Sequence, residues 1–185
     1  AVGFVQRFAI GPSLMDRWFG FSEAWYRVPS LIAAAGAVLA MAWIARRLIH
    51  PQAGWFAALG CFSMGGINAE AVDARPYALG MLVAALSVVF VIRWLDRARV
   101  ADAALFILFA ALLWRTHLVY WPFYLVFPLY AGARLLKKET PAGRLDAVTV
   151  FAVLGLTLIP VGLRAFELMR GAAAHVIVPP PTLRN

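Results

Sequence analysis

The sequence has one cysteine, few acidic residues and no long polar segment. Its 185 residues include 9 Asp and Glu against 17 Lys and Arg, and only 14% of them are charged. The single cysteine, Cys61, excludes an intramolecular disulfide framework. Because no polar or low-complexity linker divides the chain, we expect residues 1–185 to form a single domain.

Hydrophobic residues make up 63% of the chain, more than a soluble domain of this length buries in one core. This composition is typical of a polytopic membrane protein, with membrane lipids as its surroundings. The formal net charge is +8, but the arginines are spread between hydrophobic runs and do not gather on one polar face. The charge therefore does not predict nucleic acid as a partner.

Apolar runs predict an all-α, polytopic transmembrane bundle of about six membrane helices. A membrane-spanning helix needs about 20 mostly apolar residues. The candidate runs cover residues 29–45, opened by a proline suited to a first helical turn, then 53–67, 77–92, two runs within 102–136, and 147–163. Residues 1–28 are then an external juxtamembrane segment, 29–163 hold the six helices, and 164–185 begin an external loop.

The run between residues 103 and 135 is too long for one membrane helix. As a single helix it would measure about 50 Å, well beyond a hydrocarbon core of about 30 Å. The polar triplet Arg115, Thr116 and His117 interrupts it. We therefore predict a helical hairpin with this triplet at its tip.

Basic residues predict the orientation of the chain. The short loops around 46–52, 93–101 and 134–146 are dense in Arg and Lys, which places them in the cytoplasm by the positive-inside rule. Residues 1–28, the 68–76 loop, the hairpin tip and the C-terminal tail then face the exterior. Since the chain begins without Met and has no signal-peptide pattern, we expect it to be part of a longer protein.

The stretch NAEAVDARPY, residues 68–77, is the most polar feature between two apolar runs. Arg75 has the planar fork that binds phosphate in bidentate fashion, and Glu70 or Asp73 could orient it, accept a proton or ligate a divalent cation. The alternative is structural: these groups mark where the chain enters water, and Asp73 favours the start of the next helix. Both interpretations stay open at this point.

Two further polar features fall on the same predicted side. His117 is either a structural histidine or, with Glu70 and Asp73, part of a metal site, although no short ligand motif is present. In the segment at residues 19–30, Glu23 and Arg27 are four residues apart and would be neighbours on a helix. Arg27 then either forms a surface ion pair or meets a lipid phosphate at the headgroup level.

The order of these features resembles a known family. It runs from Gly20, Ser22, Glu23, Arg27, Pro29 and Ser30, through a membrane helix, the basic turn ARRLIHPQAGW and a second helix, to D-A-R-P-Y-A-L at 73–79. This resembles the early part of membrane glycosyltransferases of the GT-C fold, and most closely the family 39-like bacterial proteins. That group is related to dolichyl-phosphate-mannose protein mannosyltransferases and includes the aminoarabinose transferase. The loop commonly reads E-A-R-P-Y in that family, so Asp73 is a conservative departure.

The resemblance implies an enzyme of a bacterial-type plasma (inner) membrane, with its active face external. It implies transfer of a sugar from a polyprenyl-phosphate donor to a lipid, glycan or protein acceptor. The catalytic aspartate expected in the family would lie upstream of Ala1, and Asp73 is the candidate base within this chain. By this resemblance Arg75, Arg27 and Arg115 would hold the donor phosphate, with Glu70, Tyr77 and His117 supporting them.

No cofactor is certain from the sequence, and a divalent metal ion on Glu70, Asp73 and His117 stays open. The alternative function is a transporter or flippase for a lipid-linked or anionic substrate. Transporters place charged residues near the bilayer midplane, whereas here these groups cluster at one surface. A non-catalytic membrane scaffold would leave them without a common cavity.

Overall fold

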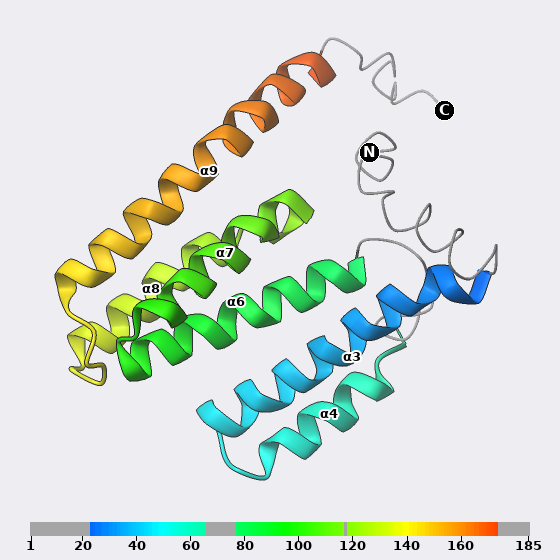
Figure 1. Cartoon of the computed structure of the whole chain (residues 1–185), viewed down its shortest axis with the longest axis horizontal. Helices are drawn as coiled ribbons and strands as arrows, with labels where there is room; N and C mark the ends of the chain where they lie inside the picture. Colours follow the sequence, from blue (N-terminus) through cyan, green and yellow to red (C-terminus); the bar gives the residue numbers. More distant parts are fainter. Residues whose placement is uncertain (1–22, 66–76, 117, 174–185) are drawn as a thin grey trace, which may run out of the picture.

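The computed structural model describes residues 23–65, 77–116 and 118–173, and this part of the chain is helical (Figure 1). Each run is apolar on all sides, which suits a membrane. There every backbone N–H and C=O needs a hydrogen-bond partner within the chain, and a helix supplies these partners. The elements are α3 (Glu23–Leu48), α4 (Ala53–Ser63), α6 (Tyr77–Arg97), α7 (Val100–Thr116), the 3-10 turn η1 (Leu118–Tyr120), α8 (Phe123–Leu136) and α9 (Arg144–Ala173).

The helices alternate in direction, so their connections gather at two ends (Figure 1). We call one of these the basic end; it holds the turns at 49–52, 98–99 and 137–143. The opposite end holds the starts of α3 and α6, the tip between α7 and α8, and the last turns of α4 and α9. The three basic loops thus lie at one end of the bundle, and their placement in the cytoplasm stays a prediction.

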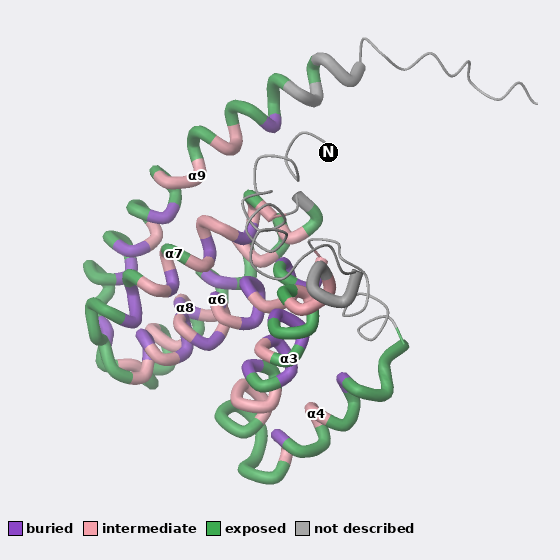
Figure 2. The backbone as a smooth tube through the Cα atoms, turned by 45° about the vertical axis from the view of Figure 1, so that its right-hand side comes forward, coloured by how far each residue is buried: buried purple, intermediate pink, exposed green. Residues whose placement is uncertain are grey.

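Helix α6 is the centre of the bundle. It packs against α3, α7 and α8, and Figure 2 shows buried residues along its whole length. Around its second half lies a core of aromatic rings, in which Phe106 of α7 contacts Trp94 of α6 and Phe127 of α8 at centroid distances of 6.3 and 5.1 Å. Such offset and edge-to-face pairs contribute beyond their buried area, so they fix how α6, α7 and α8 pack.

The outer helices are much less covered. Within an 18-residue window, 61% of α6 is buried but only 17% of α9. On α4, the large apolar side chains of Trp55, Phe56, Leu59 and Phe62 are exposed. In a membrane protein such faces contact lipid, because placing apolar side chains against hydrocarbon costs no free energy.

Among the residues that the structure describes, three helices have the length and composition to cross a membrane: Arg27–Leu48, Tyr77–Arg97 and Arg144–Glu167. The other three have 11, 17 and 14 residues, which correspond to about 17, 26 and 21 Å of helix. The structure thus supports a helical membrane bundle with a hairpin at 100–136, as predicted. A count of six full spans stays a prediction.

The predicted start of the first membrane helix was wrong. Pro29 lies inside α3, which begins at Glu23, and does not occupy the first turn of the helix. Proline removes one backbone donor, and transmembrane helices tolerate this where neighbours or local adjustment satisfy the freed carbonyl. The backbone of residues 23–28 is therefore the first part of α3.

Candidate functional site

Four of the predicted site residues lie outside the described residues: Glu70, Asp73, Arg75 and His117. The proposed metal ligands are among them. Within the part of the chain that the structure describes, no group of three His, Cys, Asp or Glu side chains could hold a metal ion. The geometry available for the site is therefore that of Arg27, Tyr77 and Arg115 and of the elements that carry them.

Helices α3 and α6 bring Arg27 and Tyr77 to the same end of the bundle. Tyr77 is the first residue of α6, and the next residue, Ala78, is fully buried against Ala33 and Ala34 of α3. Small side chains at this crossing let the two backbones approach closely. Arg27 lies six residues before Ala33, near the start of α3. Like Tyr77, it is therefore at the end of the bundle that lies away from the basic end.

Residues 118–122, which connect α7 to α8 and which we call the tip from here on, are fixed against the first turn of α6. A Cβ added at Gly80 would lie 2.8 Å from both the ring carbon Cε2 and the hydroxyl of Tyr120, which belongs to η1. Only glycine leaves room for this ring, so the sequence places the tip within a turn of Tyr77. Tyr120 also contacts Phe123 at the start of α8, with ring centroids 6.2 Å apart.

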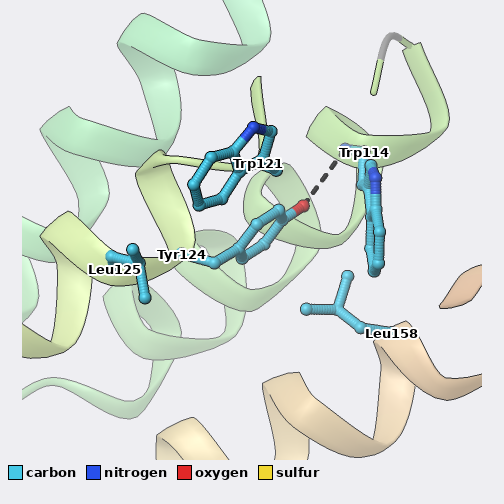
Figure 3. Close-up of a pocket in the computed structure, with 5 residues that line it drawn as sticks. All are labelled: Trp114, Trp121, Tyr124, Leu125 and Leu158. Carbon is cyan, nitrogen blue, oxygen red and sulfur yellow. Dashed lines mark hydrogen bonds between the residues drawn. The ribbon is translucent and has the colours of Figure 1, made fainter. Parts of the chain in front are cut away.

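Tyr124 joins the two arms of the hairpin. Its hydroxyl donates a hydrogen bond of 2.6 Å to the carbonyl of Ala110. It also accepts one of 3.1 Å from the backbone N–H of Trp114 (Figure 3). A tyrosine in an apolar setting needs such partners for its hydroxyl. These bonds hold the last turns of α7, including Arg115, in a fixed position relative to α8.

An apolar cavity of about 400 Å³ opens beside the hairpin tip (Figure 3). Its lining comes from α7, the tip, α8 and α9, and comprises Trp114, Trp121, Tyr124, Leu125 and Leu158. Three aromatic residues, Trp114, Trp121 and Tyr124, thus line a hollow between the hairpin and α9. The size is within the range of small-molecule pockets, and the lining suits hydrocarbon.

Arg115 is exposed in the last turn of α7, next to Trp114 in the cavity wall. Helix α9 passes the tip at Gly162, where an added Cβ would lie 3.7 Å from the ring of Trp114. The eleven residues of α9 from 163 to 173 therefore extend about 16 Å past this point. Arg115 is adjacent in sequence to the wall of the hollow and is not among the residues that line it.

The sequence interpretation missed an ionic cluster at the basic end. Asp96 accepts a hydrogen bond of 2.8 Å from Nε of Arg47 and one of 3.0 Å from an Nη of Arg134, which joins α3, α6 and α8 through one carboxylate. The sequence signal that could have revealed this cluster is the position of Asp96 in the last turn of its helix. A carboxylate in the last turn of a helix is disfavoured by the helix dipole, so it needs cationic partners.

Asp102 is a second carboxylate that the sequence interpretation overlooked. It is 3% exposed, and Nε of Arg93 lies 2.9 Å from its Oδ1 in an ion pair without hydrogen-bond alignment. Asp102 lies in the first turn of α7, where a negative charge is favoured. Both carboxylates therefore act in holding helix ends together, far from the predicted external site.

The comparisons with known proteins leave the family open: no protein-family model, curated protein or solved structure matches this chain.

Proposed function

We propose that the chain is part of an integral membrane glycosyltransferase of the GT-C type with about six membrane helices. It would transfer a sugar from a polyprenyl-phosphate donor to a lipid, glycan or protein acceptor at the outer face of the membrane. The proposal rests on the sequence resemblance described above. One structural observation supports it: Arg27, Tyr77 and Arg115, from three different helices, lie at the same end of the bundle.

The chemistry needs few groups. A sugar on a lipid phosphate is already activated, so the enzyme must remove a proton from the acceptor and stabilise the negative charge that builds on the departing phosphate. Arg27, Arg75 and Arg115 would supply positive charge, and Asp73 is the candidate base within this chain. Glu70 and His117 would orient these groups or hold a divalent metal ion.

The apolar cavity would serve the donor's hydrocarbon tail. It opens at the hairpin tip beside Arg115, so a lipid whose phosphate meets this guanidinium would have its first isoprene units against Trp114 and Trp121. The hydroxyl of Tyr124 already has both of its partners within the protein, so hydrocarbon in the cavity would not leave this group unsatisfied. This arrangement supports a lipid-linked donor over a soluble sugar nucleotide.

The test is sugar transfer by membranes that contain the complete protein. A panel of isotopically labelled polyprenyl-phosphate hexoses and pentoses is incubated with lipid, glycan and peptide acceptors, and the label in each acceptor is measured. Transfer is expected for at least one pair, and it should fall at least tenfold in Arg27→Gln and Arg115→Gln. Arg46→Gln, which removes an arginine from the other end of the same helix as Arg27, is the matched control and should keep its activity.

A transporter or flippase would give a different result. Reconstituted vesicles would then move the labelled lipid across the bilayer without releasing its sugar. That outcome, together with no label in any acceptor, would refute the glycosyltransferase proposal.

A further inference from the structure

The structure divides the cations at and around the α6–α7 and α8–α9 turns into two groups. Three arginines are used inside the bundle: Arg47 and Arg134 pair with Asp96, and Arg93 pairs with Asp102. The others at the α6–α7 and α8–α9 turns are exposed, and none of them has an ion pair among the described residues. We call these the free cations: Arg97, Arg99, Lys137, Lys138 and Arg144.

The two turns that carry the free cations lie against each other. The hydroxyl of Thr140, in the α8–α9 turn, donates to the carbonyl of Leu95 in the last turns of α6. Arg134, three residues before Lys137, reaches Asp96, the neighbour of Arg97. The two turns thus carry five free cations against the two exposed carboxylates of Glu139 and Asp146, and this excess of three positive charges favours an anion.

Several of the free cations occupy positions that do not favour a cation for the sake of the fold. Arg99 precedes the start of α7 and Arg144 is the first residue of α9, so both lie at helix N-termini, where the dipole favours negative charge. Lys138 has a φ of 56°, in the left-handed region where glycine is favoured. Its N–H and that of Glu139 bond to the carbonyls of Leu135 and Arg134, the pattern of a Schellman motif, which commonly has glycine at this position.

Exposed apolar side chains alternate with these charges. Val100, Leu136 and Leu145 are 84%, 79% and 78% exposed, and each is adjacent in sequence to a free cation. A site for a soluble phosphate or for nucleic acid would not need these exposed apolar side chains. A lipid headgroup joined to acyl chains meets both kinds of side chain at the same depth.

We infer that the α6–α7 and α8–α9 turns form a binding site for anionic phospholipids. The phosphate and its charge contact the free cations, and the upper acyl chain lies against the exposed apolar residues of the same turns. The site lies at the other end of the bundle from the sugar-transfer site and does not depend on that proposal. It would anchor this end of the bundle to a leaflet rich in anionic lipid.

The test is a lipid titration of the purified chain in neutral detergent, with bound lipids counted by native mass spectrometry. The probes are phosphatidylglycerol, phosphatidylcholine and glycerol 3-phosphate. Phosphatidylglycerol is expected to bind at least tenfold more tightly than phosphatidylcholine, and glycerol 3-phosphate should not compete with it. Each Lys or Arg near an anionic surface contributes about a fivefold change in affinity. Lys138→Gly should therefore weaken phosphatidylglycerol binding roughly fivefold. The triple variant Lys137→Gln, Lys138→Gly and Arg144→Gln should weaken it on the order of 100-fold.

Lys138→Gly separates lipid binding from folding. It removes a charge but also relieves the backbone at a positive φ, so its melting temperature in neutral detergent should rise while its affinity for phosphatidylglycerol falls. Ala98→Gly is the matched control, because Ala98 has a φ of 50° in the neighbouring turn and the change leaves the charge intact. Arg164→Gln, at the far end of α9, should leave affinity unchanged.

Three results would overturn the inference. These are equal affinity for phosphatidylglycerol and phosphatidylcholine, competition by glycerol 3-phosphate, and unchanged lipid affinity in Lys138→Gly. The first would mean that the cations only set the orientation of the chain, and the second that the site takes a soluble anion.

Discussion

Asp96 should be the residue whose loss weakens the bundle most at its basic end. Its two carboxylate oxygens bind Arg47 of α3 and Arg134 of α8, which are 49 and 38 residues away in sequence. Asp96→Ala removes both interactions at once. It leaves the guanidinium of Arg134 with the hydroxyl of Tyr130 and the backbone carbonyl of Glu139 as its remaining hydrogen-bond partners.

The two interactions differ in burial, and this sets the expected magnitudes. The side chains of Asp96 and Arg134 are 14% and 16% exposed, whereas that of Arg47 is 51% exposed. Breaking a fully buried pair costs about 3–5 kcal/mol, and an exposed pair is worth about 0–1 kcal/mol. We therefore expect Asp96→Ala and Arg134→Ala each to lower the free energy of unfolding by about 2–3 kcal/mol, and Arg47→Ala by less than about 1 kcal/mol.

The assay is reversible unfolding in mixed micelles by titration with sodium dodecyl sulfate, followed by loss of helical circular dichroism. A double-mutant cycle between Asp96 and Arg134 should give a coupling energy above about 1 kcal/mol, and a cycle between Asp96 and Arg47 a smaller one. Asp96→Asn keeps the shape and some hydrogen bonding, so its stability should fall between wild type and Asp96→Ala. If Asp96→Ala and Arg47→Ala lowered the free energy of unfolding by equally small amounts, the reasoning that burial sets the strength of these ion pairs would be refuted.

Three further changes test the opposite end. Gly80→Val should displace the ring of Tyr120, because a Cβ at this position lies within 2.8 Å of it; the accessibility of a cysteine introduced at position 119 should rise, and Gly60→Val, in open space on α4, is the control. Tyr124→Phe should cost about 1–2 kcal/mol in the same micelle titration, because the carbonyl of Ala110 loses its bond from the hydroxyl; unchanged stability would contradict the role of that bond. Arg75→Ala in the complete protein should abolish sugar transfer and leave membrane insertion intact, as measured by labelled-sugar transfer and protease protection; wild-type turnover would remove Arg75 from the site.

The sequence alone determined the helical class and the order of the helices. Apolar runs of about 20 residues predict membrane helices because the bilayer core has a fixed thickness. The same length argument required the 103–135 run to turn back at Arg115, and the structure has α7 ending at Thr116. Alternation of direction then follows from short connections, so the basic turns share one end without any knowledge of packing.

Only the tertiary structure decided which side chains meet. The helices are apolar on every face, so no periodic stripe shows which face of α6 contacts α3 or α7, and the pairing of Asp96 with cations 49 and 38 residues away is invisible to local spacing. The same holds for the packing of Tyr120 on Gly80 and for the cavity under Trp114. Helix formation depends on neighbours in the chain and on the thickness of the bilayer. The site depends on contacts between distant segments, and those are fixed only when the helices pack.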